Sequence, residues 1–354
     1  MAGGTVVVEV SAGPARYTAD LADPACLDPR EVGGKAAGLA ALAADGLPVA
    51  PGFAVGAAAF RDFLDAAGAS GAGAGDLADR LAATPVPAAV EAEIRREYAA
   101  LCARAGVSDL PVAIRSSATA EDAAGASFAG GYDTWLDVSG ADAVVEHVHR
   151  CWTAVLGDRA VEYARAGGID PATVEMAVVV QQTVRARAAG VMFTISPVTG
   201  DRSRIVVEAS WGLGVAVVGG EVTPDRWVVD KIALTIVSRT PGDKRVAYRR
   251  GGLAVAVDAD RRTELCLTDE QVLELARTGK QVERERGGAQ DLEFAVGADR
   301  QIVLLQCRPE TVWSARVPAP RFDPGAGVTS WISGAVSGLA GAAPAGHHHH
   351  ADAA

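Results

Sequence analysis

Seven short apolar segments from residue 174 onward constrain the fold of this chain more than any other feature. They are rich in β-branched residues and bounded by turn-forming residues, and they read VEMAVVVQQTV, AAGVMFTIS, SRIVVEASWG, DRWVVDK, ALTIVSR, DLEFAV and QIVLLQCRP. Helical patterns stand before and between them, namely PAAVEAEIRREYAALCARAG, AVVEHVHRCWTAVLGDRAVEYARAGG and TDEQVLELARTGKQVERERG, the last opened by a Thr-Asp-Glu cap. Because strands and helices alternate irregularly and no repeat is visible, the sequence predicts an α/β (α+β) fold with mixed sheets in two lobes.

Size and charge limit the domain number and the partners. With 354 residues, 49% of them hydrophobic, the chain can bury a large core, and we expect an N-terminal lobe over residues 1–205 and a C-terminal lobe over 206–320. The small-residue segment 321–354 is expected to be a flexible tail, and the stretch GASGAGAGDLAD a flexible surface connection. A formal net charge of -11 argues against a nucleic-acid partner, because binding to phosphate backbones requires a basic surface.

Cysteine usage and hydropathy favour a cytoplasmic protein without a membrane partner. The five cysteines form no CxxC pair, so we expect reduced thiols. No segment reaches the roughly 18 uninterrupted apolar residues of a membrane span, and the N-terminus lacks a basic region followed by a long apolar one.

The histidines do not favour a metal site. The run from His347 to His350 lies in a small-residue tail, where an expression tag or an incidental tract is the favoured explanation. His147 and His149 stand two residues apart on an expected helix and would face different directions, which favours structural or surface roles.

Two segments carry features of a phosphate site. Gly33, Gly34 and Lys35 directly precede a helical pattern, where backbone N–H groups and a cation can meet a polyphosphate. This is not a Walker P-loop, and a loop glycine pair with a solvated lysine remains the alternative. In VAIRSSATAEDAAGASFAGGYDT, Arg115 follows an apolar strand, and hydroxyls and a glycine turn that leads to Thr134 come after it. An arginine at a strand end can span two phosphates, so this segment predicts a phosphate cradle.

A third segment predicts a magnesium site. DLEFAV and QIVLLQCRPE read as a hairpin that places Glu293 beside Gln306, with Arg308 two residues further on. A carboxylate and an amide oxygen are hard ligands that suit Mg²⁺ when phosphates also hold the ion. An edge hairpin with polar residues facing water is the alternative.

These elements together resemble the ATP-grasp domain of the phosphoenolpyruvate synthase, pyruvate phosphate dikinase and rifampicin phosphotransferase family. The resemblance runs from about residue 31 to 313 and rests on VGGKAAGLAAL, GLPVAPGFAV, VAIRSSATAEDAAGASFAGGYDT, VVVQQTVRARAAGVMFTISPVTG, EASWGLG, VTPDRW, DLEF and LLQCRPE. It implies a two-lobed ATP-grasp fold with ATP and Mg²⁺ between the lobes.

The resemblance also implies a role for each candidate residue. Lys35, Arg115 and Arg308 match residues that contact phosphates, Thr134 lies near the phosphate tail, and Gln181 near the adenine end.

Two further positions, Glu293 and Gln306, match the magnesium ligands of the family. No side chain among these candidates needs to act as a nucleophile, because phosphoryl transfer depends on positioning and charge neutralisation.

The implied reaction needs a partner. In the family, the β-phosphoryl group of ATP passes to a histidine on a swivelling domain, with AMP and phosphate as products. The TSHAA-like phosphohistidine motif is absent here, so the chain resembles a stand-alone ATP-binding subunit of a phenylphosphate synthase-type system. A separate polypeptide would then supply the swivelling histidine and the site for a small hydroxyl acceptor, with a phenol favoured. A fragment of a phosphoenolpyruvate synthase or a rifampicin phosphotransferase is the alternative.

One position departs from the family pattern. Members commonly read GLGE, whereas Val215 follows Gly214 here, and Glu208 or Glu221 could only partly substitute for that glutamate. The departure keeps open a non-catalytic protein that binds nucleotide and regulates a partner.

Overall fold

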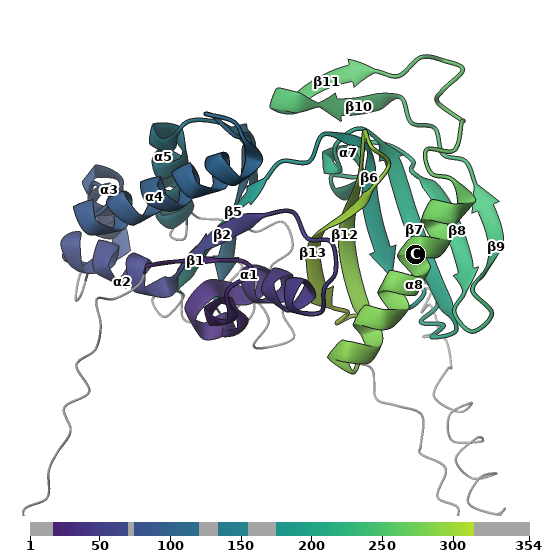
Figure 1. Cartoon of the computed structure of the whole chain (residues 1–354), viewed down its shortest axis with the longest axis horizontal. Coiled ribbons are helices and arrows are strands. Elements are labelled where there is room, and N and C mark those ends of the chain that lie inside the picture. The colour runs from purple at the N-terminus through teal and green to yellow at the C-terminus, as the bar shows by residue number, and fades with distance from the viewer. Residues whose placement is uncertain (1–16, 70–73, 120–133, 155–174, 315–354) are drawn as a thin grey trace, which may run out of the picture. The chain divides into compact units, whose positions relative to one another are not determined.

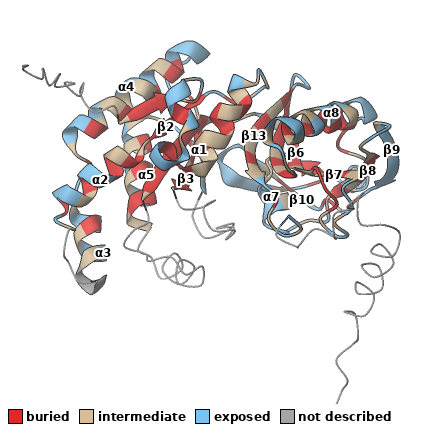
Figure 2. Ribbon diagram, turned by 90° about the horizontal axis from the view of Figure 1, so that it is seen from below, coloured by how far each residue is buried: buried red, intermediate tan, exposed pale blue. Residues whose placement is uncertain are grey.

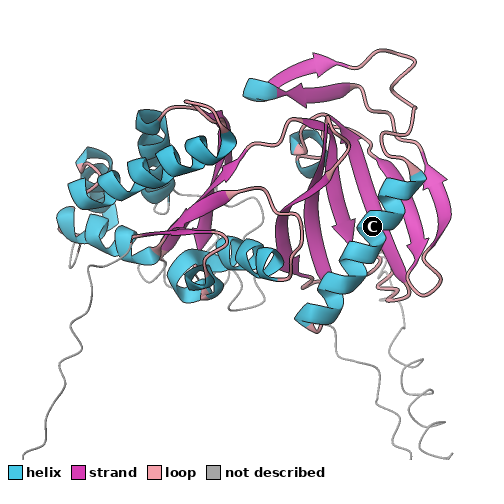
Figure 3. Ribbon diagram, viewed as in Figure 1, coloured by secondary structure: helices cyan, strands magenta, loops and turns pink. Residues whose placement is uncertain are grey.

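The computed structural model describes residues 17–69, 74–119, 134–154 and 175–314, and two β-sheets organise this part of the chain (Figures 1 and 3). The paired strands within each sheet are antiparallel, and parallel contact is confined to isolated bridges such as Val49 with Leu304. The predicted helix-and-sheet fold class is therefore confirmed, although the sheets are antiparallel rather than mixed in strand direction.

The N-terminal sheet has the strand order β1-β2-β5-β3-β4. Its strands are β1 (Thr18–Asp20), β2 (Gly52–Val55), β3 (Val112–Ala118), β4 (Thr134–Val138) and β5 (Met176–Gln182). Strand β5 lies between β2 and β3, so a segment distant in sequence completes the centre of the sheet. Its side chains are buried on both faces, which explains the unbroken apolar run MAVVV.

Helices cover both faces of this sheet (Figure 2). They are η1 (Pro24–Leu27), α1 (Pro29–Ala44), α2 (Ala57–Ala66), α3 (Ala74–Ala83), α4 (Ala88–Ala105) and α5 (Ala141–Thr153). On one face Val178 and Val180 join the core formed with α2, α4 and α5, whereas Val179 faces α1 on the other. The alternation of neighbouring residues between two cores is what a strand with period two requires.

The C-terminal sheet has the strand order β13-β12-β6-β7-β8-β9. Its strands are β6 (Ala186–Phe193), β7 (Arg204–Trp211), β8 (Asp225–Asp230), β9 (Thr235–Thr240), β12 (Gln290–Gly297) and β13 (Ile302–Pro309). Helix α8 (Asp269–Arg286) packs on one face, and Thr268 forms a capping box with Gln271 at its start, as the Thr-Asp-Glu pattern predicted. The short helix α7 (Val215–Val218) and the hairpin of β10 (Val246–Arg249), η4 (Arg250–Gly252) and β11 (Leu253–Ala256) complete this part.

Helix α1 connects the two sheets. It contacts β3 and β5 of the first sheet and β13 of the second. Gly38 lies so close to this strand that a Cβ there would stand 2.7 Å from the Cys307 carbonyl oxygen. Just after the helix, the Pro48 carbonyl accepts a hydrogen bond of 2.7 Å from the Leu304 N–H. The small residues of the AAGLAAL pattern thus allow a close contact between helix and strand.

Two predicted boundaries differ from the observed elements. The expected lobe boundary after residue 205 falls inside β7, and the chain passes from one sheet to the other between β5 and β6. The predicted flexible connection GASGAGAGDLAD is partly helical, because its end begins α3, where Leu81 is fully buried in the helical core. The expected tail 321–354 lies outside the described residues.

All five cysteines are buried. Within the described ranges, no helix is both long and apolar enough to span a bilayer.

Candidate functional site

Arg115 forms a direct side-chain contact between the two sheets. It lies on β3, yet its Nη2 donates to Glu293 Oε2 on β12 at 2.6 Å and its Nη1 donates to the Leu305 carbonyl on β13 at 2.8 Å. The side chain is only 15% exposed, so this ion pair is largely shielded from water. The strand VAI therefore delivers a guanidinium directly to the residues predicted to bind metal and phosphate.

A β-bulge in the β12–β13 pair exposes the backbone carbonyl that Arg115 contacts. Glu293 pairs with Gln306 and Phe294 pairs with Leu304, which leaves Leu305 as an extra residue on β13. The bulge frees the Leu305 carbonyl from the ladder, and Arg115 binds it. The prediction that Glu293 and Gln306 lie side by side on a hairpin is confirmed.

These two side chains fit a magnesium ion that shares its coordination with phosphates. In the described part of the chain, no group of three or more His, Cys, Asp or Glu side chains is arranged to hold a metal by itself. Mg²⁺ commonly binds one or two protein oxygens and takes its remaining ligands from phosphate and water. Glu293 and Gln306 offer a carboxylate and an amide oxygen in adjacent register, which is such a donor set.

The segment that carries Lys35 is anchored to β3. Gly33 has φ +75°, which interrupts helical geometry, and a Cβ at this position would lie 2.1 Å from the Ser117 carbonyl oxygen. The Ser117 hydroxyl accepts from the Lys35 N–H at 3.2 Å and donates to the Val32 carbonyl at 3.1 Å. The predicted helix start at the glycine pair thus corresponds to a break inside α1.

The hydroxyl of Ser117 does not have the role that the sequence suggested. It is fully buried and holds α1 against β3, so it is engaged with the backbone and not presented to a phosphate. Ser116 is also buried. The glycine turn predicted before Thr134, at residues 127–133, lies outside the described residues.

Arg308 and Asp291 form a second pair beside the first. They are directly paired across β12 and β13, with 3.3 Å between Arg308 Nη2 and an Asp291 carboxylate oxygen. Burial raises the pKa of Asp291 to about 6, with Arg308 opposing and Glu310 reinforcing the shift. Sequence reasoning missed Asp291, although its place two residues before Glu293 in DLEF puts both carboxylates on one face of the strand.

A row of side chains that begins at Glu293 runs across one face of the C-terminal sheet. Glu293, Val191, Glu208 and Arg226 are successive cross-strand neighbours, so their side chains share one face. Glu208 and Arg226 stand 3.3 Å apart as an ion pair. The neighbouring row on the other face joins the core beneath α8 and consists of Leu292, Met192, Val207 and Trp227.

The two remaining candidates lie on the N-terminal sheet. Thr134 is exposed and pairs with Arg115, so it stands beside the site. Gln181 is buried on β5, and its Nε2 donates to the Ala50 carbonyl at 3.2 Å. The structure brings Arg115, Glu293, Gln306 and Thr134 together, while the amide of Gln181 is turned to the backbone of the segment before β2.

Neither carboxylate suggested as a replacement occupies the position of Val215. Val215 begins α7, whereas Glu208 is paired with Arg226. Glu221 accepts a hydrogen bond of 2.7 Å from the Tyr248 hydroxyl.

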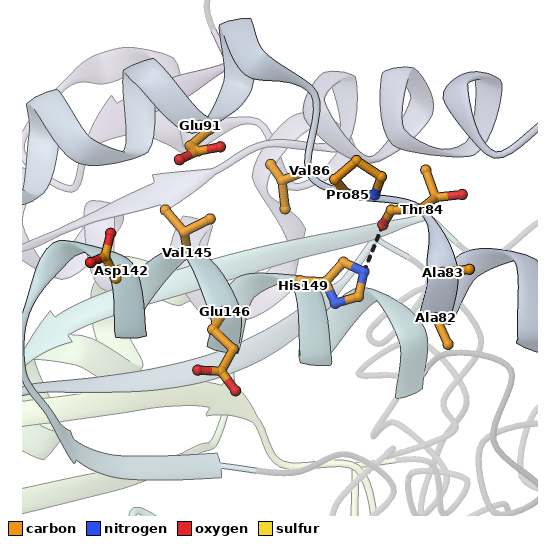
Figure 4. A pocket seen from close by; sticks show the side chains of 10 residues that line it. All are labelled: Ala82, Ala83, Thr84, Pro85, Val86, Glu91, Asp142, Val145, Glu146 and His149. Carbon is orange, nitrogen blue, oxygen red and sulfur yellow. Dashed lines mark hydrogen bonds between the residues drawn. The ribbon is translucent and has the colours of Figure 1, made fainter.

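A surface pocket on the helical side of the N-terminal sheet contains none of the candidate residues (Figure 4). It lies between the end of α3, the start of α4 and α5, and His149 lines it. The Nε2 of His149 contacts the Thr84 carbonyl at 2.9 Å and the Leu81 carbonyl at 3.2 Å. His149 thus closes the end of α3, in agreement with its predicted structural role.

Two antiparallel sheets, with Arg115 of one bound to Glu293 of the other, agree with a domain of the ATP-grasp type. The chain belongs to the family of the pyruvate phosphate dikinase AMP/ATP-binding domain, which matches residues 29–323.

Similar proteins include phosphoenolpyruvate synthases of archaea. A probable phosphoenolpyruvate synthase of Staphylothermus marinus is 40% identical over 333 residues, which covers 80% of this chain and 40% of the relative. The phosphoenolpyruvate synthase of Aeropyrum pernix is 38% identical over 80% of this chain and 41% of its own length. The prodigiosin synthesizing transferase PigC of Serratia marcescens is 40% identical over 82% of this chain and 33% of the relative. The chain thus spans less than half the length of these relatives.

Proposed function

We propose that this chain is the ATP-binding part of a dikinase-type phosphotransferase. It would transfer the β-phosphoryl group of ATP to a histidine on a separate swivelling-domain protein, leaving AMP and phosphate. That partner would then phosphorylate a small hydroxyl compound, with a phenol as the favoured acceptor. The observation that carries the proposal is the meeting of Arg115 with Glu293 and the Glu293–Gln306 pair.

The residues of the site divide the work of phosphoryl transfer. Arg115 can exchange the Glu293 carboxylate and the Leu305 carbonyl for phosphate oxygens, because a guanidinium offers five donors in a planar fork. Glu293 and Gln306 would hold Mg²⁺, which when bound neutralises phosphate charge. Arg308 provides a further cation, and Lys35 follows the backbone segment fixed by Ser117.

Phosphate and metal can replace the two partners of the ion pair between Arg115 and Glu293. Each group neutralises the other within a contact of 2.6 Å. A phosphate and a cation arriving together would satisfy both groups at once, whereas either alone would leave one largely buried charge without a counter-charge. This arrangement favours binding of the metal–nucleotide complex over binding of either component.

The histidines of the described region make structural contacts, which supports a carrier histidine outside this region. His147 Nδ1 contacts the Ala143 carbonyl at 2.7 Å, and His149 closes the end of α3. Both lie on α5, where their contacts are those of structural residues. The run from His347 to His350 lies outside the described residues.

A second candidate function is supported by the relatives. Because the archaeal phosphoenolpyruvate synthases match over about two fifths of their length, the chain can be the ATP-grasp piece of such an enzyme or of a rifampicin phosphotransferase. A third candidate, a non-catalytic nucleotide-binding regulator, is favoured only by Val215 at the glutamate position.

The test uses β-labelled ATP with Mg²⁺, incubated with the purified chain alone and with the phosphohistidine-domain protein encoded nearest to it. We expect label on the partner and AMP only when the partner is present. The Arg115→Ala variant should lose both products, whereas Arg150→Ala, which removes an exposed arginine of α5, should retain them. Tight ATP binding without AMP or labelled partner would favour the regulatory candidate.

The same assay separates the acceptors. Addition of phenols or pyruvate to the labelled partner should release the label onto the true acceptor. Transfer to pyruvate and not to phenols would favour the phosphoenolpyruvate synthase candidate.

A further inference from the structure

The β10–η4–β11 hairpin, residues 246–256, forms an arm attached to the end of β7 (Figure 1). At its base, the Leu213 N–H donates to the Tyr248 carbonyl at 2.8 Å, and the Tyr248 hydroxyl donates to Glu221 at 2.7 Å. Strand β11 is mostly exposed, with Leu253 62% exposed, whereas β10 is exposed only at Arg249 and buries Ala247. A two-stranded hairpin of this kind is marginally stable by itself, so its position depends on its contacts.

The tip of the arm touches the N-terminal sheet. Asp137 on β4 accepts a hydrogen bond through Oδ2 from the Gly251 N–H. Besides this bond, η4 packs against β4, so the contact joins the tip of the arm to an edge strand of the N-terminal sheet. The two residues lie 114 positions apart in the chain.

The backbone on both sides of this contact is left-handed, which is uncommon for an aspartate and ordinary for glycine. Asp137 has φ +58°, a left-handed conformation rare outside glycine, and it lies where the β3–β4 register shifts. Gly251 and Gly252 at the tip have φ +77° and +67°. The register shift places two residues of β4 opposite one residue of β3, which redirects the Asp137 carboxylate.

The second carboxylate oxygen of Asp137 is buried. Oδ1 has no hydrogen-bond partner among the described residues, although the Asp137 side chain as a whole is only half-buried. A buried acceptor without a partner is unfavourable, and a strained backbone adds to the cost. Both features persist because the surrounding structure holds the residue in this place.

We propose that Asp137 is a positioning residue that clasps the arm to β4 and thereby fixes the two sheets in the arrangement that forms the ATP site. One end of the clasp is the strand that pairs Thr134 with Arg115. The other end is the arm attached beyond Glu208, which shares the sheet face with Glu293. The clasp adds a connection between the sheets to those made by α1 and by Arg115.

The clasp has a direct test that does not depend on activity. Arg249 and Arg250 are exposed at the tip, so trypsin can cleave there when the arm detaches. Cleavage after Arg202, which is exposed in the loop between β6 and β7, serves as the internal reference. Mass spectrometry gives the ratio of the two initial rates.

We expect the tip-to-reference ratio to rise about tenfold in Asp137→Ala, because a hydrogen bond to a charged group is lost. Asp137→Asn retains an oxygen acceptor without the charge and should give an intermediate ratio. Asp142→Ala, which removes an exposed carboxylate of the neighbouring α5, is the matched control and should leave the ratio unchanged. An unchanged ratio in Asp137→Ala would overturn the clasp.

A second variant separates the carboxylate from the backbone strain. Asp137→Gly removes the side chain but tolerates the left-handed conformation, so it should fold even where Asp137→Ala does not. It should still raise the ratio at the tip. A wild-type ratio in this variant would show that the carboxylate does not hold the arm.

The link to nucleotide rests on the proposed function and is measured separately, by calorimetric titration of ATP with Mg²⁺. We expect the Kd to rise in Asp137→Ala and Asp137→Gly and to recover partly in Asp137→Asn. Wild-type affinity in a variant with a loosened arm would overturn the coupling to the site. Failure of every variant and the wild type to bind ATP would refute the proposed function, while the proteolysis result would still decide the clasp.

Discussion

The ion pair between Arg115 and Glu293 leads to a quantitative prediction for the nucleotide-free protein. Its 2.6 Å contact is charge-assisted, and the two side chains are 15% and 24% exposed. A hydrogen bond to a charged group contributes about 1.5 to 3 kcal/mol, and partial exposure favours the lower part of that range. We therefore expect a coupling energy of about 1 to 2 kcal/mol between the two side chains.

The assay is a double-mutant cycle in urea. The free energies of unfolding of Arg115→Ala, Glu293→Ala and the double variant are compared with that of the wild type. The stability losses of the two single variants should add up to more than the loss in the double variant, because each single change leaves the remaining charge without its partner. Additivity within about 0.3 kcal/mol would show that the pair does not form in solution. Phosphate and metal could then not replace the two partners of this pair as proposed.

The same variants test the exchange itself. ATP with Mg²⁺ at 100 times its Kd should stabilise the wild type by about 2.7 kcal/mol, provided that the unfolded chain does not bind it. The same ligand concentration should stabilise Arg115→Ala much less. Equal stabilisation of both proteins would remove Arg115 from the phosphate site.

Three further predictions concern the surroundings of the site. Gly33→Ala should lower the free energy of unfolding by more than about 3 kcal/mol, because its Cβ would lie 2.1 Å from the Ser117 carbonyl oxygen. The control is Gly46→Ala, because Gly46 has a similar φ of +72° and no atom of the described residues within 4 Å of a Cβ. This variant should cost only about 1 kcal/mol in the same urea titration. Because burial raises the pKa of Asp291 to about 6, its proton binds the folded state more tightly, and stability relative to Asp291→Asn should rise by about 2 kcal/mol as pH falls from 7 to 4; a pH-independent difference would contradict the shift. Val215→Glu should increase AMP formation with the partner if the departure weakens the site, and an unchanged rate would mean that the site functions with valine.

The local sequence pattern was sufficient to predict strand pairing and helix starts where the interacting segments are neighbours in sequence. DLEFAV and QIVLLQCRP are separated by a short turn, so their pairing and the adjacency of Glu293 and Gln306 could be predicted. The start of α8 followed from its cap, and the break at Gly33 agrees with a glycine pair before a helix. In contrast, the helix α3 was missed, because its Ala- and Gly-rich composition resembles a linker while Leu81 is buried by tertiary packing.

Roles of individual side chains were harder to predict. A serine after Arg115 in a phosphate-like motif suggested a free hydroxyl, but the close approach of Gly33 engages Ser117 with the backbone of α1. Asp291 has an ordinary neighbourhood in the sequence, and its raised pKa comes from burial within the fold. Such effects depend on which distant segments surround a residue.

The sequence by itself determined the periodicity of the strands and helices, the register of the β12–β13 hairpin and the residue types of the site. These features follow from local backbone preferences and from short chain separations. The tertiary structure alone decided that β5 completes the N-terminal sheet, that Arg115 meets a glutamate 178 positions away, and that Asp137 holds the arm. Contacts between distant segments are selected by the summed packing and electrostatic energies of the whole chain, which no single segment contains.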